Sequence, residues 1–383
     1  RAPTAGGVDT RISAPKMIDG DRRQGGAVAD HTEAASWLAI LEADDIPRKA
    51  AKSVLQRWCL DDARSMREFM GLAVEDLTEH LDLAPAVLAK MLAKSGQVAS
   101  WEQRLASLTE QDYYVILRQD AAYPHLLAER LDPAHQPYYI FYQGELELLA
   151  EPAVWITGAP SPSGAAQALA QALGQATAPL EAALVGGYEE GVERLTMNAS
   201  LAVGGSAVFV LPLGIERFAG ALTSFQVPLR EGRLLVLSPY APDAELSDLR
   251  AQARREIVAA LAGVGLLIEP PSGPEDWPGH DALTRGRVPM AVWRRGDQAQ
   301  IEAWTRSGAQ LVDDLDGAQA YLAELVSPIE DETIAAIRAK WGLDLPLHEQ
   351  YFVWAGNLLR GDFGTSLIRT GVPVRTMIFE AIP

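Results

Sequence analysis

The sequence predicts an α/β fold, in which a doubly wound, mainly parallel sheet follows a small all-α domain and precedes an irregular helical tail. The front of the chain carries apolar residues at helical spacing. From Tyr113, short β-rich runs alternate with alanine-rich helical stretches, a pattern typical of a parallel sheet with helices on both faces. After Val326, glycines and prolines interrupt every regular pattern. We therefore expect a flexible arm over residues 1–33, an all-α domain over 34–104, an α/β domain over 105–326 and a separate tail over 327–383.

The composition describes a folded protein with few candidates for chemistry. Of the 383 residues, 48% are hydrophobic, and no apolar run approaches the roughly 18 residues that span a bilayer. We therefore expect no membrane insertion and a cytoplasmic location. Cys59 is the only cysteine and the 6 histidines are scattered, so we expect neither a disulfide nor a metal or other cofactor. The chain begins at Arg1 and ends on an apolar run, so we interpret it as a fragment.

The net charge limits the kind of nucleic-acid site that this chain can have. Its formal value is −18 at pH 7. A protein that binds nucleic acid neutralises phosphates with lysine and arginine, so its binding face is usually basic. Any such site in this chain must therefore be local.

Helices and strands can be drawn from the spacing of the apolar residues. The front predicts a helical hairpin over 34–60, broken at 44–47, and a second helical pair over 69–81 and from Pro85 to about Gly96. The expected strands are 154–157, 183–185, 207–211, 234–237, 266–269, 289–293 and 310–312. The expected helices between them include 164–173, 191–202 and 246–261. This order is that of an extended Rossmann-like domain.

Several short motifs occur along this domain in a definite order. The first is Tyr123-Pro124 with two leucines, followed by an extended run and a strand that opens into the glycine-containing loop 158–164. Later come the turn 186–193, the arginines of 250–255 and the strand 286–292. In order and spacing, residues 34–326 resemble the DNA processing protein A (DprA/Smf) family, with the motifs lying within 105–326. The resemblance implies a Rossmann-like fold, single-stranded DNA as ligand and no catalysed reaction.

A glycine-rich turn between a strand and a helix exposes backbone N–H groups beside the positive end of the helix, which suits a phosphate. In a doubly wound sheet such turns meet at the carboxyl ends of the strands. With the arginines that the family motif implies, the candidate phosphate contacts are Ser161, Ser163, Gly164, Gly186, Gly187, Arg250, Arg254 and Arg255.

The chain departs from the family pattern at three places. Ala159-Pro160 stands where the family has an arginine, and Pro160 has no N–H to donate. Glu189 and Glu190 bring negative charge to a helix N-terminus, which repels a phosphate. The front has Asp45-Ile46-Pro47 where a DNA-binding helical hairpin needs Gly-Ile-Gly, so we expect that turn not to hold DNA. We therefore expect weak DNA binding that falls steeply with salt.

Structural interpretations compete with each functional one. The loop 158–164 can simply start a helix, and the three arginines can pair on a solvated face with Glu245, Asp248 or Glu256. The aromatic residues near the start of the domain can be core or can stack on bases, and alternation along an extended run favours core; they are Tyr138, Tyr139, Phe141 and Tyr142.

The family resemblance implies a role in DNA processing and natural transformation. It implies handover of single-stranded DNA to a RecA-type recombinase, and a homodimer is possible. We find no nucleophile with a base and no phosphate loop of the Walker type, so we expect no enzymatic activity. An alternative is a degenerate Rossmann module that binds a nucleotide or a protein partner.

The tail resembles a different family. Residues 332–347 and 357–366, with Trp354 between them, are similar to the extracytoplasmic segment of oligopeptide and dipeptide ABC transporter permeases. The flanking membrane helices of such a permease are absent. A second alternative is therefore a permease fragment, joined to the rest by a fusion or by an error of sequence assembly.

Overall fold

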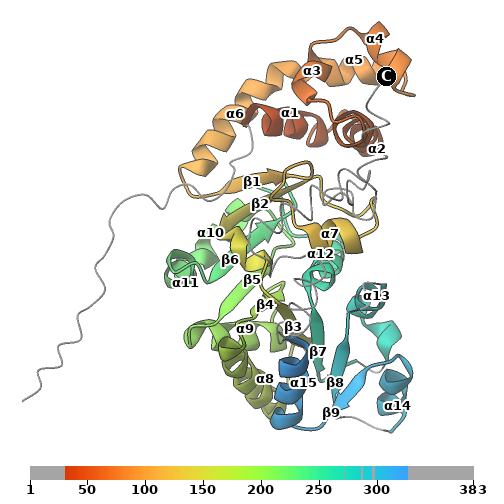
Figure 1. The fold of residues 1–383 in the computed structure, drawn as a ribbon. Coiled ribbons are helices and arrows are strands. Elements are labelled where there is room, and N and C mark those ends of the chain that lie inside the picture. Colours follow the sequence, from red (N-terminus) through yellow and green to blue (C-terminus); the bar gives the residue numbers. More distant parts are fainter. Residues whose placement is uncertain (1–30, 272, 286–287, 296–297, 327–383) are drawn as a thin grey trace, which may run out of the picture. The chain divides into compact units, whose positions relative to one another are not determined.

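A computed structural model describes residues 31–271, 273–285, 288–295 and 298–326, apart from a few side chains near residue 280 (Figure 1). The predicted arm up to residue 30 and the permease-like tail lie outside the described residues. The chain divides into two compact units at Ser327, and all that follows concerns the first, Arg1–Val326. Within the part that the structure describes, no helix is long and apolar enough to cross a membrane.

The described part of the chain begins with a group of helices that we call the helical front, residues 31–109. Its elements are α1 His31–Leu41, α2 Arg48–Val54, the π-helical turn Leu55–Asp61, α3 Met66–Met70, α4 Val74–His80, α5 Pro85–Ala93 and α6 Ser95–Thr109. The break between α1 and α2 falls at the predicted turn. The helix predicted from Pro85 to about Gly96 is α5, which ends at Ala93, and the next helix, α6, was not predicted. Trp37, Trp58 and Phe69 are fully buried and make up much of this core.

The rest of the described chain, which we call the sheet domain, has one nine-stranded sheet of order β1-β2-β6-β5-β4-β3-β7-β8-β9. Strands β3 to β9 pair in parallel, whereas β1 and β2 are antiparallel additions beside β6. The bounds are β1 Tyr114–Leu117, β2 Tyr139–Gly144, β3 Ala153–Gly158, β4 Ala183–Gly186, β5 Ser206–Val210, β6 Leu234–Ser238, β7 Val264–Ile268, β8 Met290–Trp293 and β9 Gln310–Val312. This confirms the predicted mainly parallel α/β fold.

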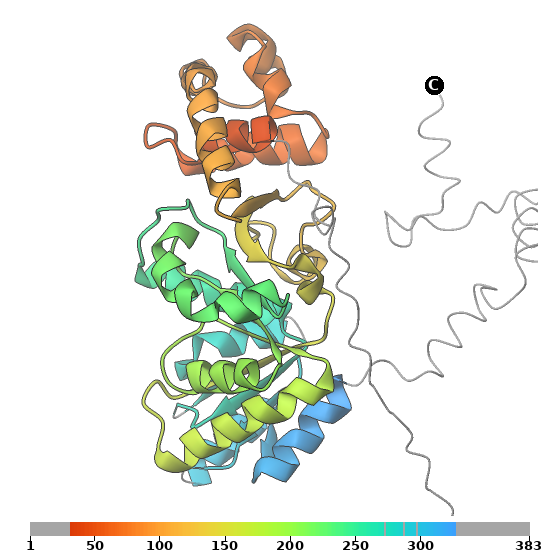
Figure 2. The ribbon, with the colours of Figure 1, turned by 90° about the vertical axis from the view of Figure 1, so that its left-hand side faces the viewer.

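Helices cover both faces of this sheet (Figures 1 and 2). They are α7 His125–Arg130, α8 Gly164–Thr177, α9 Val192–Ala202, α10 Ile215–Leu222, α11 Gln226–Arg230, α12 Asp248–Leu261, α13 Pro278–Arg285, α14 Gln298–Arg306 and α15 Leu315–Val326. Short 3-10 turns lie at Leu146–Leu149, Ala178–Leu180, Thr223–Phe225 and Pro274–Asp276. Side chains alternate between two cores, since Val154 and Ile156 pack on the side of α8 and Trp155 on the side of α12.

The helical front is joined to the sheet domain through the aromatic start of β2. The Tyr139 hydroxyl donates to Glu42 Oε1 at 2.5 Å, and the Tyr138 hydroxyl donates to the Lys52 carbonyl at 3.2 Å. On the far side of the same junction, Arg104 pairs with Glu216 at 2.8 Å. Tyr138, Tyr139, Phe141 and Tyr142 are all buried, which confirms that this aromatic run belongs to the core.

Candidate nucleic-acid interface

The crevice of a doubly wound sheet opens where the strand order reverses, between β3 and β7 in this chain. The loop after β3, the turn after β4 and the end of β7 meet there. The N–H of Val192 donates to the Ala159 carbonyl at 3.2 Å, which ties the turn after β4 to the loop after β3. The predicted segments around Ser163 and around Gly187 therefore lie together, as the topology requires.

The loop after β3 has the shape of a helix start. Ser161, Ser163 and Gly164 are exposed, and the Ser163 hydroxyl caps α8 by accepting from the Ala166 N–H at 3.3 Å. The backbone N–H of Ser163 is already used, because it donates to Glu269 Oε2 at 2.9 Å. Glu269 follows β7 and so spans the crevice with its side chain.

The backbone N–H groups of the turn after β4 point toward a buried carboxylate of the chain. Glu193, buried on the first turn of α9, accepts from the N–H of Gly187 at 2.9 Å and of Glu189 at 3.0 Å. Its second oxygen accepts from Trp155 Nε1 at 2.7 Å. Burial raises the pKa of the Glu193 carboxyl, and these hydrogen bonds oppose that rise. Glu193 therefore takes the two amides that a phosphate-binding turn would offer.

Arg254 and Arg255 reach this turn from α12. Both guanidinium groups donate to Glu189 Oε1, Arg255 at 3.0 Å. Arg254 is 3% exposed, and its Nη1 donates to the Gly187 carbonyl at 3.4 Å. Burial is the main cause that lowers the pKa of Arg254 to about 10, and the neighbouring charge of Arg255 adds to it. The expected pairing with Glu245, Asp248 or Glu256 on a solvated face is therefore wrong for these two arginines.

Gly187 leaves room for this approach. A Cβ added there would lie 2.4 Å from Cζ of Arg254, so any other residue would force the buried guanidinium to shift. Gly186 lies directly over Glu193, because a Cβ added at this glycine would be 3.2 Å from the carboxylate. Both glycines serve an internal ion cluster.

Arg250 does not join the turns. Its guanidinium lies 5.3 Å from the centre of the Tyr240 ring, and it donates to the Glu245 carbonyl. It lines a separate cavity beside the helical front. Three carboxylates accept hydrogen bonds from the backbone N–H and guanidinium groups that we expected to contact a phosphate; they belong to Glu189, Glu193 and Glu269. Only Glu189 was singled out from the sequence; the other two fell in ordinary helix and strand patterns.

These features define a class, the Rossmann-like domain with glycine turns and basic residues at the switch edge of a parallel sheet. Residues 114–273 match the family model described as DNA recombination-mediator protein A. This match lies within the sheet domain and agrees with the resemblance that the order of the motifs indicates.

Two solved structures are similar to the described fold. The X-ray structure of DNA processing protein A from Streptococcus pneumoniae has a TM-score of 0.57 and 19% identity, covering 76% of this chain and 97% of that one. At this identity the likeness shows the fold. The second is a structure of DNA processing protein A from Helicobacter pylori, which was determined in a study of how that protein binds single-stranded DNA. It has a TM-score of 0.46 and 19% identity, and covers 55% of this chain and 96% of that one.

Curated relatives are similar over a short stretch. An oligopeptide transport system permease protein of Bacillus subtilis is 48% identical over 44 residues, which is 12% of this chain and 14% of the relative. A dipeptide transport system permease protein of Lactococcus lactis is 42% identical over 52 residues, 14% of this chain and 17% of the relative. The chain thus spans less than a fifth of the length of these two permeases.

Proposed function

We propose that the sheet domain binds single-stranded DNA in DNA processing and that its affinity at the switch edge is low. The observation that carries the proposal is the meeting of Arg254 and Arg255 with the Gly186-Gly187 turn, inside a domain of the DNA recombination-mediator protein A family. The fold shared with DNA processing protein A from Streptococcus pneumoniae agrees with this family.

The low affinity follows from competition within the chain. A phosphate must displace Glu189 from Arg255, and it finds the amides of Ser163 and Gly187 already bonded to Glu269 and Glu193. Each displaced carboxylate loses charge-assisted hydrogen bonds, which are worth about 1.5–3 kcal/mol each. DNA therefore replaces bonds rather than adding them, and the net gain is small.

The test is fluorescence anisotropy with a labelled oligothymidylate and the Arg255→Ala variant. Arg255 is half-buried at the mouth of the turn. Arg230 is exposed on α11, where it donates to the Gln226 carbonyl of its own helix, so Arg230→Ala is the charge-matched control. Arg255→Ala should weaken binding severalfold more than the control. Equal effects of the two variants would show that this edge is not the DNA site.

The finer parts of the role are proposals as well. We propose that the chain passes DNA to a RecA-type recombinase, pairs as a homodimer, acts without catalysing a reaction and works in the cytoplasm. We also propose Ser161, Ser163 and Gly164 as DNA contacts, and 34–104, 105–326 and 327–383 as the domain limits. Pull-down of a purified recombinase in the presence and absence of oligonucleotide tests the first of these.

A second candidate is favoured by the internal carboxylates. With Glu189, Glu193 and Glu269 in place, the turns resemble a finished structural cluster, as in a degenerate Rossmann module that has exchanged DNA for another ligand. Absence of any oligonucleotide binding in low salt would favour this candidate. The permease resemblance concerns residues outside the described part of the chain and adds no function to the sheet domain.

A further inference from the structure

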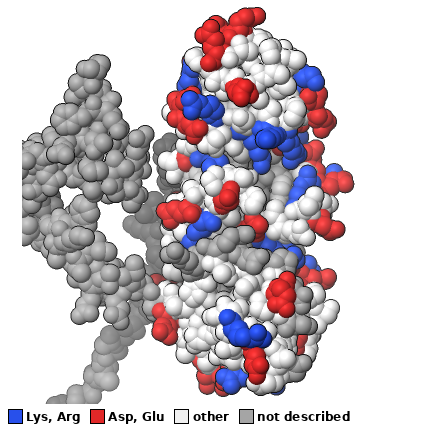
Figure 3. All heavy atoms as spheres, turned by 90° about the vertical axis from the view of Figure 1, so that its right-hand side faces the viewer, with Lys and Arg blue, Asp and Glu red and all other residues white. Residues whose placement is uncertain are grey.

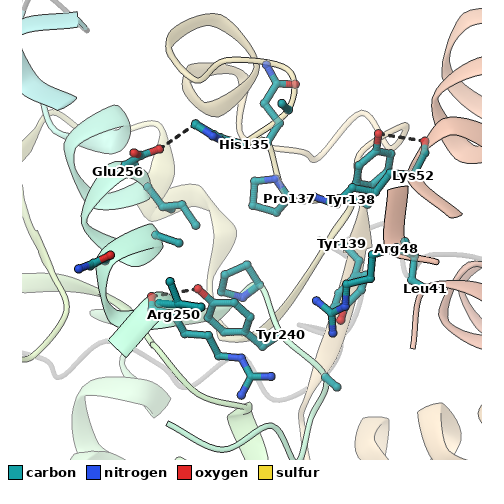
Figure 4. A pocket seen from close by; sticks show the side chains of 18 of the residues that line it. Leu41, Arg48, Lys52, His135, Pro137, Tyr138, Tyr139, Tyr240, Arg250 and Glu256 are labelled. Atoms are coloured by element: carbon teal, nitrogen blue, oxygen red, sulfur yellow. Dashed lines mark hydrogen bonds and ion pairs between the residues drawn. The ribbon is translucent and has the colours of Figure 1, made fainter. Parts of the chain in front are cut away.

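A cavity lies between the helical front and the sheet domain, away from the glycine turns (Figure 4). Its volume is about 420 Å³, within the range of roughly 300–1,000 Å³ that is usual for small-ligand pockets. Its walls come from the end of α1 and from α2, from the segment before β2, from the loop after β6 and from the first turns of α12. Both parts of the molecule are needed to form it.

Cations gather in this cavity. Arg48 and Lys52 come from α2 and Arg250 from α12, and Figure 4 shows the two arginines on opposite walls. Among the described residues, neither Arg48 nor Lys52 has an ion pair with a carboxylate. Lysine and arginine side chains also gather on the molecular face where the helical front meets the sheet domain (Figure 3).

The acidic groups of the cavity have partners of their own. Glu42 accepts from the Tyr139 hydroxyl at 2.5 Å, and Glu256 lies 3.1 Å from Nδ1 of His135. Burial raises the pKa of Tyr139, Glu42 adds to this rise, and Arg48 and Arg250 both oppose it. The cavity lining thus holds three cationic side chains against two carboxylates, a local excess of positive charge in a chain of net charge −18, and such an excess attracts an anion.

Aromatic rings lie beside these cations. Tyr240 is half-buried, donates its hydroxyl to the Arg250 carbonyl at 3.1 Å and carries the Arg250 guanidinium over its ring. Tyr138 is flanked by Lys52, with Nζ 5.8 Å from the ring centre. Phosphate-binding cations next to a ring that can stack on a base are the two elements of nucleotide recognition.

We propose that this cavity binds a nucleotide, with its phosphate between Arg48 and Arg250, its charge also met by Lys52, and its base against Tyr240. The nucleotide is either free or one unit of a single-stranded DNA. In the second case the proposal rests on the proposed function and moves the main DNA-binding site from the glycine turns to the junction. This site uses side chains of α2, so it does not need the Gly-Ile-Gly turn that the front lacks.

The test uses the full chain and two probes, thymidine monophosphate by calorimetry and a fluorescein-labelled oligothymidylate by anisotropy. The variant is Arg48→Ala with Arg250→Ala. The control is Arg67→Ala with Arg230→Ala, which removes two exposed arginines that do not line the cavity. Lys52→Ala is a second variant, and we expect it to fold because Lys52 is exposed on a helix. Circular dichroism checks the fold of every variant.

The expected result is a loss of about tenfold or more in affinity for both probes in the Arg48, Arg250 variant, with the control unchanged. The slope of affinity against salt for the oligonucleotide should fall by about 0.7 for each phosphate that the variant no longer neutralises. Lys52→Ala should show a smaller loss of the same kind. Arg255→Ala should keep full affinity for thymidine monophosphate.

Other outcomes separate this proposal from the proposed function. Binding of thymidine monophosphate that the double variant loses, without any oligonucleotide binding, keeps the cavity as a free-nucleotide site and overturns the DNA role. Loss of oligonucleotide binding in Arg255→Ala but not in the Arg48, Arg250 variant places the DNA site at the glycine turns. The cavity proposal is overturned if that double variant also keeps its affinity for thymidine monophosphate. The cavity proposal also fails if the unmodified chain binds neither probe, or if a polyglutamate peptide displaces the nucleotide equally well.

Discussion

Glu193 Oε2 accepts the backbone N–H of Gly187 at 2.9 Å, so a carboxylate of the chain sits where a phosphate-binding turn would hold its ligand. The same oxygen accepts from the N–H of Glu189, and the other accepts from Trp155. Both oxygens of this buried side chain are therefore acceptors. This relationship explains how a turn with the glycines of a phosphate-binding turn can be internally complete, and it leads to the first two predictions.

Glu193→Gln should destabilise the fold by about 1–3 kcal/mol, the cost of a buried donor left without its acceptor. The amide nitrogen of glutamine cannot accept, so either Trp155 or the pair of backbone N–H groups loses its partner. Urea unfolding followed by circular dichroism measures the change. Glu190→Gln, at an exposed neighbouring position, is the control and should cost little. A stability of Glu193→Gln equal to that of the control would contradict the internal role of this carboxylate.

The stability margin of the wild type over Glu193→Gln should shrink as the pH rises. Burial raises the folded-state pKa of Glu193 above its ordinary value of 4.5. A carboxyl with a raised folded-state pKa contributes stability that is fully present below the unfolded pKa and is lost as the pH passes through the folded pKa. Urea unfolding of both proteins at intervals from pH 4 upward checks this. A margin that grows with pH would mean that the hydrogen bonds outweigh burial.

Glu189→Gln should strengthen binding of an oligothymidylate by up to about tenfold in low salt. The substitution removes the charge that holds Arg255, so a phosphate gains one charge-assisted bond without displacing a carboxylate. Glu190→Gln removes the same charge from the adjacent residue, which pairs with Arg194 instead. Anisotropy titrations of the wild type and the two variants measure the affinity for the oligonucleotide. An equal gain in affinity in both variants would mean that only the change in net charge matters.

Gly187→Ala should destabilise the sheet domain by about 1–3 kcal/mol through overpacking. The new methyl group would lie 2.4 Å from Cζ of the buried Arg254, so the guanidinium would have to shift within the core. Gly96→Ala is the control, because no atom lies within 4 Å of its Cβ position in α6 and alanine favours a helix. Thermal unfolding should rank Gly187→Ala lowest and Gly96→Ala at or above the wild type. A tolerated Gly187→Ala would mean that Arg254 leaves the turn readily.

The strands and helices of the sheet domain were predictable because their signals are local. The run at β4 and the alanine-rich stretch of α8 each show their periodicity within a few residues. The antiparallel β1 and β2 were not predicted as strands, because their apolar and aromatic runs do not say which strand will pair with them. Helix α6 was missed because Gly96, near its start, was interpreted as the end of the preceding helix, whereas a helix tolerates one glycine at modest cost.

The sequence by itself determined the α/β class, the family motifs and the position of the glycine turns, since these depend on the spacing of neighbouring residues. Which side chains form hydrogen bonds with those turns was decided by the tertiary structure. Ser163 and Glu269 are 106 residues apart, and Glu189 and Arg255 are 66 apart, so only the closing of the sheet brings each donor to its carboxylate. From the sequence, the charge of Glu189 is expected to repel a phosphate. In the fold this carboxylate pairs with Arg255, so a phosphate would have to replace it.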